Sequence, residues 1–304
     1  MASSTEITHE FPPFIRVYKD GRFERLQTSP LIPPSTDPVT GVQSKDIVIS
    51  PDHEVKSRIF LPKINPVDPP KKLPLVIHIH GGGFCIGSPV NVVTQSVVMP
   101  LVSQTPAVVL SIGYRLAPEH PLPTAHHDCW AAYQWIASHA LGSGPEPWIN
   151  DYVDVNRVFL TGESAGANLA HYIAVQAGIN NSSLGIRGLI AVHPYFSQKE
   201  PEKMVKYFFP TSSGSDDDPK LNPRSDPDLE KMVCLKVLIL VAEKDHLKPR
   251  GIAYKETLEQ SKWEGTVELM ENVGEDHCFH FFEQSSEKAK ELFQTMISFI
   301  NQVM

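Results

Sequence analysis

Short apolar runs alternate with longer segments of helical periodicity over most of the chain after residue 70. The runs are rich in Val, Ile and Leu on both faces, which is typical of strands buried in a parallel sheet between layers of helices. The predicted strands are 75–79, 107–112, 158–161, 189–192, 237–242 and 267–270. The predicted helices are 91–104, 124–139, 165–177, 250–261 and 287–301. The pattern predicts an α/β protein with a mostly parallel central sheet and helices on both faces.

The first 70 residues follow a different pattern. A hairpin is predicted from strands 15–18 and 23–26 around Asp20-Gly21, and a proline-rich run follows it. A second strand pair is predicted at 47–49 and 55–61. Because the first forty residues hold too little apolar pattern for a core of their own, we interpret 1–40 as an N-terminal arm and 41–304 as one domain.

Charge and composition narrow the possible partners. The chain has 27 Lys and Arg against 35 Asp and Glu, a formal net charge of −8, and its densest basic spot is only Lys71-Lys72. Proteins that hold nucleic acid or anionic membranes through their field are usually basic or carry a basic stripe. No apolar run approaches the roughly 20 residues of a membrane span. We therefore expect neither nucleic acid nor a membrane as a partner.

The N-terminus and the cysteines indicate the compartment. The first residues show neither the positive nor the apolar region of a secretory signal, so a cytoplasmic protein is expected. Cys85, Cys129, Cys234 and Cys278 lie far apart and form no C-x-x-C pair, so we expect neither disulfides nor a zinc site. The sequence leaves the oligomeric state open, with a monomer or a weak dimer as our expectation.

A serine motif carries the first indication of chemistry. Gly162-Glu163-Ser164-Ala165-Gly166 matches G-x-S-x-G, directly after a predicted strand and directly before an alanine-rich helix. A serine on such a sharp strand-to-helix turn is exposed as a nucleophile, and the flanking glycines let strand and helix approach. The helix N-terminus behind Ser164 also directs N–H groups at an oxyanion formed there. The alternative is a serine that merely caps a helix.

A glycine run follows the predicted strand 75–79. In His80-Gly81-Gly82-Gly83 the backbone can turn its N–H groups toward a ligand. A phosphate site is the less favoured interpretation, because neither G-x-x-x-x-G-K-[ST] nor G-x-G-x-x-G is present. Together with a nucleophilic serine, the run predicts an oxyanion hole from the N–H groups of Gly82, Gly83 and Ala165.

A nucleophilic serine needs a base, which in a strand-turn-helix arrangement of this kind follows it in the chain. His171 lies on the predicted helix after Ser164 and His193 ends a strand before Pro194, so both are interpreted as structural. His246 stands beside a better acid candidate. Of His277 and His280, in a loop before the last helix, we choose His277.

The acid is expected after strand 237–242, because open α/β sheets place their ligands at the carboxyl ends of their strands. Asp245 is the preferred partner of His277 there, with Glu243 as runner-up. Asp276 is a weaker candidate, because a residue adjacent in sequence to His277 rarely points the same way. No metal or organic cofactor is implied by a Ser164, His277 and Asp245 triad.

These residues carry a resemblance to a known family. The chain resembles the plant carboxylesterases of the hormone-sensitive-lipase group from about Phe14 to Phe299. The motifs are His80-Gly81-Gly82-Gly83-Phe84, Tyr114-Arg115-Leu116-Ala117-Pro118-Glu119-His120, Gly162-Glu163-Ser164-Ala165-Gly166-Ala167-Asn168, Val241-Ala242-Glu243-Lys244-Asp245 and Gly274-Glu275-Asp276-His277. The resemblance implies an α/β-hydrolase fold, the same triad and oxyanion hole, and an arm 1–40 that contributes to a lid over the catalytic domain 41–304.

Some relatives in that group no longer act as hydrolases, which leaves other functions open for this chain. Gibberellin receptors resemble these esterases but lack the triad histidine, whereas His277 is present here. The 2-hydroxyisoflavanone dehydratases often carry threonine at the nucleophile, whereas Ser164 is serine. The expected function is therefore hydrolysis of small neutral carboxylic esters, with a dehydratase or cyclase next and a small-molecule receptor last. Between Phe196 and Asp217 the chain is shorter than is usual in the family, so we expect an open pocket.

Overall fold

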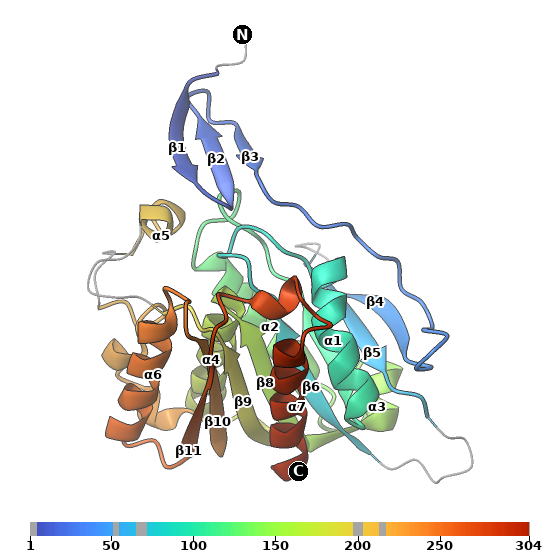
Figure 1. Ribbon diagram of the computed structural model, residues 1–304. Coiled ribbons are helices and arrows are strands. Elements are labelled where there is room, and N and C mark those ends of the chain that lie inside the picture. The colour runs from blue at the N-terminus through green and yellow to red at the C-terminus, as the bar shows by residue number, and fades with distance from the viewer. Residues whose placement is uncertain (1–4, 51–54, 65–71, 197–202, 213–216, 304) are drawn as a thin grey trace.

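A computed structural model describes residues 5–50, 55–64, 72–196, 203–212 and 217–303 (Figure 1). Its largest element is an eight-stranded sheet in the order β11-β10-β9-β8-β6-β7-β5-β4. The strands are β4 (Gln43–Ser50), β5 (Val55–Leu61), β6 (Leu73–Ile79), β7 (Val108–Ile112), β8 (Val153–Glu163), β9 (Ile186–Val192), β10 (Lys236–Ala242) and β11 (Thr266–Asn272). Strands β6 to β11 pair in parallel, and only β4 and β5 pair antiparallel with their neighbours. The predicted mostly parallel sheet is confirmed.

Helices cover the sheet on both faces. They are α1 (Val92–Gln104), α2 (Thr124–Ala137), α3 (Pro147–Tyr152), α4 (Ala165–Ile179), α5 (Lys203–Phe208), α6 (Lys248–Gln260) and α7 (Glu287–Gln302). Alternate residues of β6 show the two layers, since Val76 packs in one core with α1 and α7 while Leu75 and Ile77 pack in the other with α2, α4 and α6. Both cores are apolar and closed to solvent, which fixes the strand ends that carry the site.

Caps and turns set where the helices begin. The side chain of Asn91 accepts from the backbone N–H of Thr94 at the start of α1, and Ser286 does the same for Ala289 at the start of α7. Short 3-10 turns, η2 (Pro223–Ser225), η3 (Leu229–Lys231) and η4 (Phe279–Phe281), complete the connections. The turn η4 matters for the site because it begins directly after Cys278.

The arm forms a separate three-stranded antiparallel sheet of β1 (Ile7–Phe11), β2 (Ile15–Tyr18) and β3 (Phe23–Arg25), with β2 in the middle. Figure 1 shows this sheet projecting from the main body, with α5 beside it. Phe11 packs against Tyr207 and Phe208 of α5 with ring centroids 5.6 and 6.1 Å apart. The arm and α5 are thus joined by aromatic contacts, and Ile15 of the arm and Phe208 of α5 also belong to the core on one face of the large sheet.

Periodicity located most of these elements. Every strand and helix predicted from it is present, with ends shifted by a few residues. It missed β1, α3 and α5, which are short, and parts of the segment between Phe196 and Asp217 lie outside the described residues. None of the helices in the described ranges combines the length and the apolar character that a membrane crossing requires.

Candidate active site

Ser164 lies at the junction of β8 and α4 in a strained backbone conformation, with φ 53° and ψ −116°. A non-glycine residue with positive φ is uncommon and persists only where its surroundings hold it. A Cβ on Gly162 would lie 2.4 Å from the carbonyl carbon of Gly166, and one on Gly166 would lie 2.0 Å from Ile79 O. Strand and helix therefore meet so closely that these two positions accept only glycine, and their contact fixes the turn that presents Ser164.

The glycine loop, residues 80–83, lies against this turn. A Cβ on Gly81 would come within 3.5 Å of Ser164 Cβ. Tyr114 holds the loop in place, because its hydroxyl donates to His80 O at 2.9 Å. Gly82 has a φ of 110°, which turns the peptide in a way that a side chain would oppose. Within the described ranges, the N–H groups of residues 82, 83 and 165 donate to no protein acceptor, which leaves them free for a ligand.

Asp245 and His277 are brought together at the ends of β10 and β11. His277 Nδ1 lies 2.7 Å from Asp245 Oδ2, and the backbone N–H of Leu247 donates to Asp245 Oδ1 at 2.7 Å. The Asp245 side chain is 1% exposed and that of His277 is 28% exposed. A buried carboxylate bonded to Nδ1 orients the imidazole and leaves Nε2 outside this bond.

The other sequence candidates do not reach His277 in this way. Glu243 is exposed, and its Oε2 accepts from the backbone N–H of Gly274. Asp276 is exposed, and its Oδ1 accepts the backbone N–H of His277. His280 is buried among aromatic rings, and His171 Nδ1 is bonded to Tyr254 at 2.9 Å.

Hydrogen bonds that involve backbone atoms link Ser164 to the loop that carries His277. Within the described part of the chain no hydrogen bond joins Ser164 Oγ to His277, an arrangement common in the absence of substrate because such bonds tighten in the complex. The Ser164 N–H donates to Val192 O at 2.9 Å, and the next residue, His193, accepts from Cys278 N at 2.8 Å. His193 was expected to be structural, and Tyr114 was expected only as part of a family motif, because the contacts of both side chains with the site are to backbone atoms.

The electrostatics of the pair favour a charged aspartate beside the imidazole. Burial alone would lower the pKa of His277, but Cys278 and the hydrogen bond to Asp245 raise it above its ordinary value. Burial would raise the pKa of Asp245, but the hydrogen bond and the charge of His277 hold it below its ordinary value. Each group thus stabilises the ionised form of the other.

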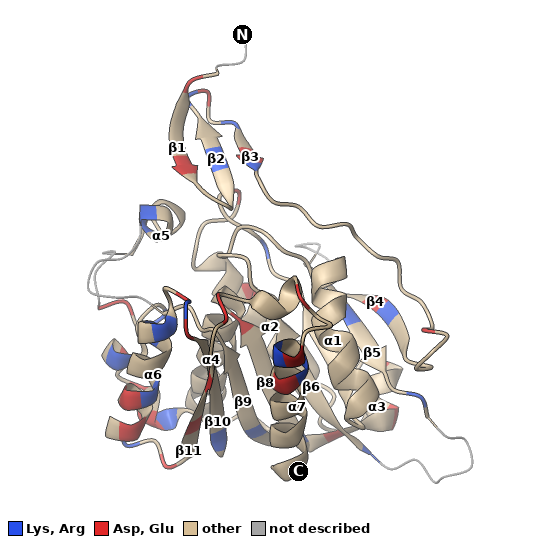
Figure 2. Ribbon diagram, in the orientation of Figure 1, with Lys and Arg blue, Asp and Glu red and all other residues tan. Residues whose placement is uncertain are grey.

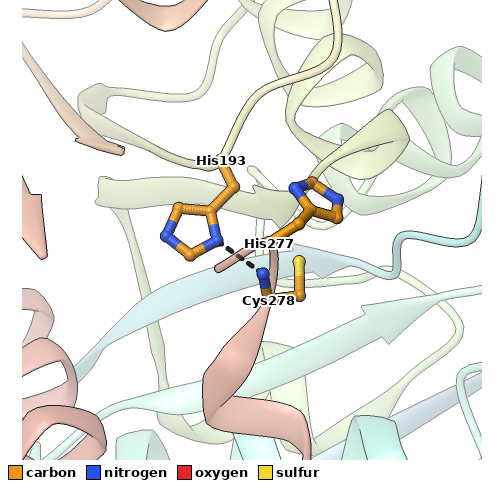
Figure 3. Close-up of side chains that lie close together, drawn as sticks. All are labelled: His193, His277 and Cys278. Carbon is orange, nitrogen blue, oxygen red and sulfur yellow. Dashed lines mark hydrogen bonds between the residues drawn. The ribbon is translucent and has the colours of Figure 1, made fainter. Parts of the chain in front are cut away.

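One group of possible metal ligands is present in the described residues. Ligand atoms of His193, His277 and Cys278 lie within 4.8 Å of one another (Figure 3). His193 Nδ1 already accepts the N–H of Cys278, and His277 Nδ1 is bonded to Asp245. Each histidine therefore already uses one ring nitrogen in a hydrogen bond to the protein.

The arm and α5 both reach the glycine loop. A Cβ on Gly83 would lie 3.2 Å from Met204 Cε of α5 and 3.3 Å from the Phe14 ring of the arm. Arg25 of the arm donates from Nε to Cys85 O at 2.7 Å and forms a salt bridge with Glu119. Two apolar side chains therefore lie against Gly83.

Comparison with known proteins agrees with this fold. Residues 76–281 match the sequence model of a protein family with the α/β-hydrolase fold. Probable carboxylesterase 2 of Arabidopsis thaliana is 41% identical over 99% of this chain and 99% of its own. Probable carboxylesterase 4, mitochondrial, of the same plant is 41% identical over 98% of this chain and 84% of its own. The 2-hydroxyisoflavanone dehydratase of Glycyrrhiza echinata is 38% identical over 99% of this chain and 100% of its own.

Solved structures show the same architecture. An esterase of Pyrobaculum calidifontis superposes with a TM-score of 0.70 at 25% identity, covering 86% of this chain and 85% of that one. A thermostable carboxylesterase from a metagenomic library gives 0.69 at 23% identity, covering 91% of each chain. The chain therefore belongs to the α/β-hydrolase fold family, in the group that contains the plant carboxylesterases and 2-hydroxyisoflavanone dehydratase.

Proposed function

We propose that the chain is a serine carboxylesterase that hydrolyses small neutral esters through Ser164, His277 and Asp245. The observation that carries this proposal is the buried Asp245 bonded to His277 at 2.7 Å, at the same sheet edge as a serine in a strained elbow. The sequence relationship to plant carboxylesterases over nearly the whole chain supports it. The residue roles below are part of the proposal.

In the first half-reaction Ser164 Oγ attacks the acyl carbon. His277 Nε2 takes the serine proton and returns it to the alcohol oxygen as the ester bond breaks, which leaves an acyl group on Ser164. Asp245 keeps its negative charge throughout, because its role is to hold Nδ1–H and to stabilise the imidazolium.

In the second half-reaction water replaces the alcohol. His277 removes a proton from the attacking water and then returns it to Ser164 Oγ, releasing the carboxylic acid. In both halves the negative oxygen is stabilised by the N–H groups of Gly82, Gly83 and Ala165, which have no protein acceptors in the described ranges. Loss of one such donor typically costs about 10²–10³ in kcat.

Charge and cover favour a neutral, rather apolar substrate. Figure 2 shows Lys and Arg interspersed with Asp and Glu on α6 and α7, so these helices present no cluster of one sign. With a net charge of −8 the protein offers no long-range attraction to anionic substrates. Phe14 and Met204 beside the glycine loop add apolar surface, and we propose that arm 1–40 acts as part of a lid over domain 41–304.

The compartment and the assembly state follow as further proposals. Cys85, Cys129, Cys234 and Cys278 are all unpaired and buried, which suits a reducing compartment such as the cytoplasm. All residues assigned to the reaction come from one chain, so a monomer or weak dimer is sufficient. Fractionation of cells and size-exclusion chromatography test these two points.

Active-site labelling tests the proposed function. A fluorophosphonate probe should modify one residue, Ser164, and an excess of p-nitrophenyl acetate should compete with it. The hydroxyl of the exposed Ser138 donates to Trp135 O of α2, so Ser138→Ala is the matched control and should label like the native protein. Labelling at another residue would reject Ser164 as the nucleophile, and no labelling at all would favour a receptor.

A dehydratase is the second candidate, because the relative named for that activity is almost as similar as the carboxylesterases. Labelling does not separate the two, since both can keep a reactive serine. The rates of p-nitrophenyl ester hydrolysis and of 2-hydroxyisoflavanone dehydration should be measured on the same preparation. Faster ester hydrolysis would support the proposed carboxylesterase. Faster dehydration would contradict it and would assign the chain as a dehydratase.

A further inference from the structure

The segment 192–195 connects the strands that carry the nucleophile and the acid. It begins at the last residue of β9, which lies between β8 and β10 in the sheet. Val192 O accepts the backbone N–H of Ser164, and Tyr195 N–H donates to Ser164 O, at 2.9 and 3.0 Å. His193 N–H donates to Leu240 O of β10 at 2.8 Å. The backbone of this segment is therefore fixed on both sides.

The side chain of His193 extends the connection to the loop that holds His277. Its Nδ1 accepts the backbone N–H of Cys278 at 2.8 Å, as Figure 3 shows. Cys278 has left-handed dihedrals, φ 52° and ψ 34°, and His193 has a φ of 45°. Non-glycine residues keep such conformations only where neighbouring contacts hold them. The hydrogen bond joins two strained residues, one of which directly follows His277.

The loop before Cys278 has few other buried contacts. Val273, Gly274 and Asp276 are exposed, and the bonds that hold this part of the loop involve the exposed Glu243 and the backbone of Glu275. His193 is 1% exposed, so its hydrogen bond is shielded from competing water.

His193 is suited to accept a hydrogen bond continuously. Burial lowers its pKa to about 3, so the ring is neutral at physiological pH. Because Nδ1 accepts the N–H of Cys278, the ring proton is on Nε2. His193 cannot serve as the general base itself, since its Nδ1 is occupied by the backbone.

We propose that His193 is a positioning residue that acts through the Cys278 N–H to hold the His277 ring between Asp245 and Ser164. This inference rests on the proposed function of His277 as general base. In this role His193, which lies outside the triad, aligns the base. The feature that matters is then an acceptor atom at the Nδ1 position rather than the imidazole ring itself.

Three substitutions at His193 separate an acceptor from mere bulk. Asn places an amide oxygen near the position of Nδ1, Gln places it farther out near Nε2, and Leu has no acceptor. We expect His193→Leu and His193→Gln to lower kcat by about 10–10²-fold with little change in KM, as for a misaligned catalytic group. His193→Asn should recover most of the native kcat.

A matched control is His171→Leu, which also removes a buried neutral imidazole but one bonded to Tyr254 rather than to the His277 loop. It should keep kcat within about threefold of the native value. Circular dichroism of each variant establishes that it is folded. If the Leu variants do not fold, the Asn and Gln variants still decide the question.

A second readout does not depend on turnover. The proton NMR resonance of His277 Nδ1–H, shared with Asp245, should be retained in His193→Asn and shifted or lost in His193→Gln. Equal kcat in the Asn and Gln variants, or an unchanged resonance in both, would overturn the inference. Ester hydrolysis that survives Ser164→Ala would reject the proposed function instead, while the NMR comparison would still test the positioning of His277.

Discussion

Asp245 and His277 are 32 residues apart in the sequence, yet His277 Nδ1 and Asp245 Oδ2 are 2.7 Å apart. The parallel pairing of β10 with β11 explains this, because it runs in register to Ala242 opposite Asn272. The two loops that follow therefore start side by side. The carboxylate is therefore buried and the imidazole is partly exposed. A serine hydrolase needs this arrangement so that the carboxylate can orient its general base.

Removing the charge of Asp245 should disable the base without unfolding the protein. In Asp245→Asn the amide can no longer hold Nδ1–H in the same tautomer, and kcat for p-nitrophenyl acetate should fall by about 10⁴. The neighbouring Glu243→Gln is the control, because its side chain contacts the Gly274 N–H and not His277. It should stay within about threefold of the native kcat. The opposite ranking would make Glu243 the acid.

The pH dependence of activity should reflect the raised pKa of His277. A general base works only when unprotonated, so kcat/KM must fall as the pH drops through the pKa of His277 in the free enzyme. Cys278 and Asp245 raise this pKa above the ordinary 6.5, despite the opposing effect of burial. The acid limb measured with an uncharged ester should therefore have its midpoint above 6.5. A midpoint below that value would contradict the assigned environment.

The elbow glycines should be intolerant of a single methyl group. In Gly166→Ala the new Cβ would meet Ile79 O at 2.0 Å, so strand and helix must separate. We expect the free energy of unfolding, measured in urea, to fall by about 2–3 kcal/mol. Gly142→Ala meets nothing within 4 Å and has a φ of 73°, so it should cost only about 1 kcal/mol. Equal losses in the two variants would show that the close approach is not a constraint.

The arm should close the site only while Arg25 holds it. Arg25→Ala removes the bonds to Cys85 O and Glu119, and it should raise KM for long-chain esters by about 5–10-fold and speed chymotryptic cleavage of the arm. Arg16→Ala is the control, because Arg16 pairs with Glu10 and Glu24 inside the arm. An unchanged KM and cleavage rate in Arg25→Ala would argue against a lid.

The fold could be predicted because its signals are local and repeated. Strands such as Val237 to Ala242 are apolar on both faces, and α7 carries a continuous apolar stripe over Leu292, Phe293 and Met296. The strand β1 was missed because its residues are exposed or only partly buried, so no alternation marks it. The helix α5 is six residues long, and its aromatic contacts with Phe11 come from a distant part of the chain.

Part of the site could likewise be predicted from local signals in the sequence. The motifs around Ser164 and Gly82 are local, and the structure brings Asp245 rather than Glu243 or Asp276 to the His277 side chain, as the position after β10 suggested. The contact of His193 with Cys278 spans 85 residues and uses a backbone N–H, so no sequence pattern could indicate it. The cover by Phe14 and Met204 likewise depends on how the arm and α5 pack.

Steady-state hydrolysis of p-nitrophenyl acetate by Ser164→Ala is the direct test of Ser164 as the nucleophile. The side chain loses only its hydroxyl at a buried position, so the variant should fold and bind as before. We expect kcat to fall by about 10⁶, as for a triad that acts as a unit. Turnover near the native rate would contradict it.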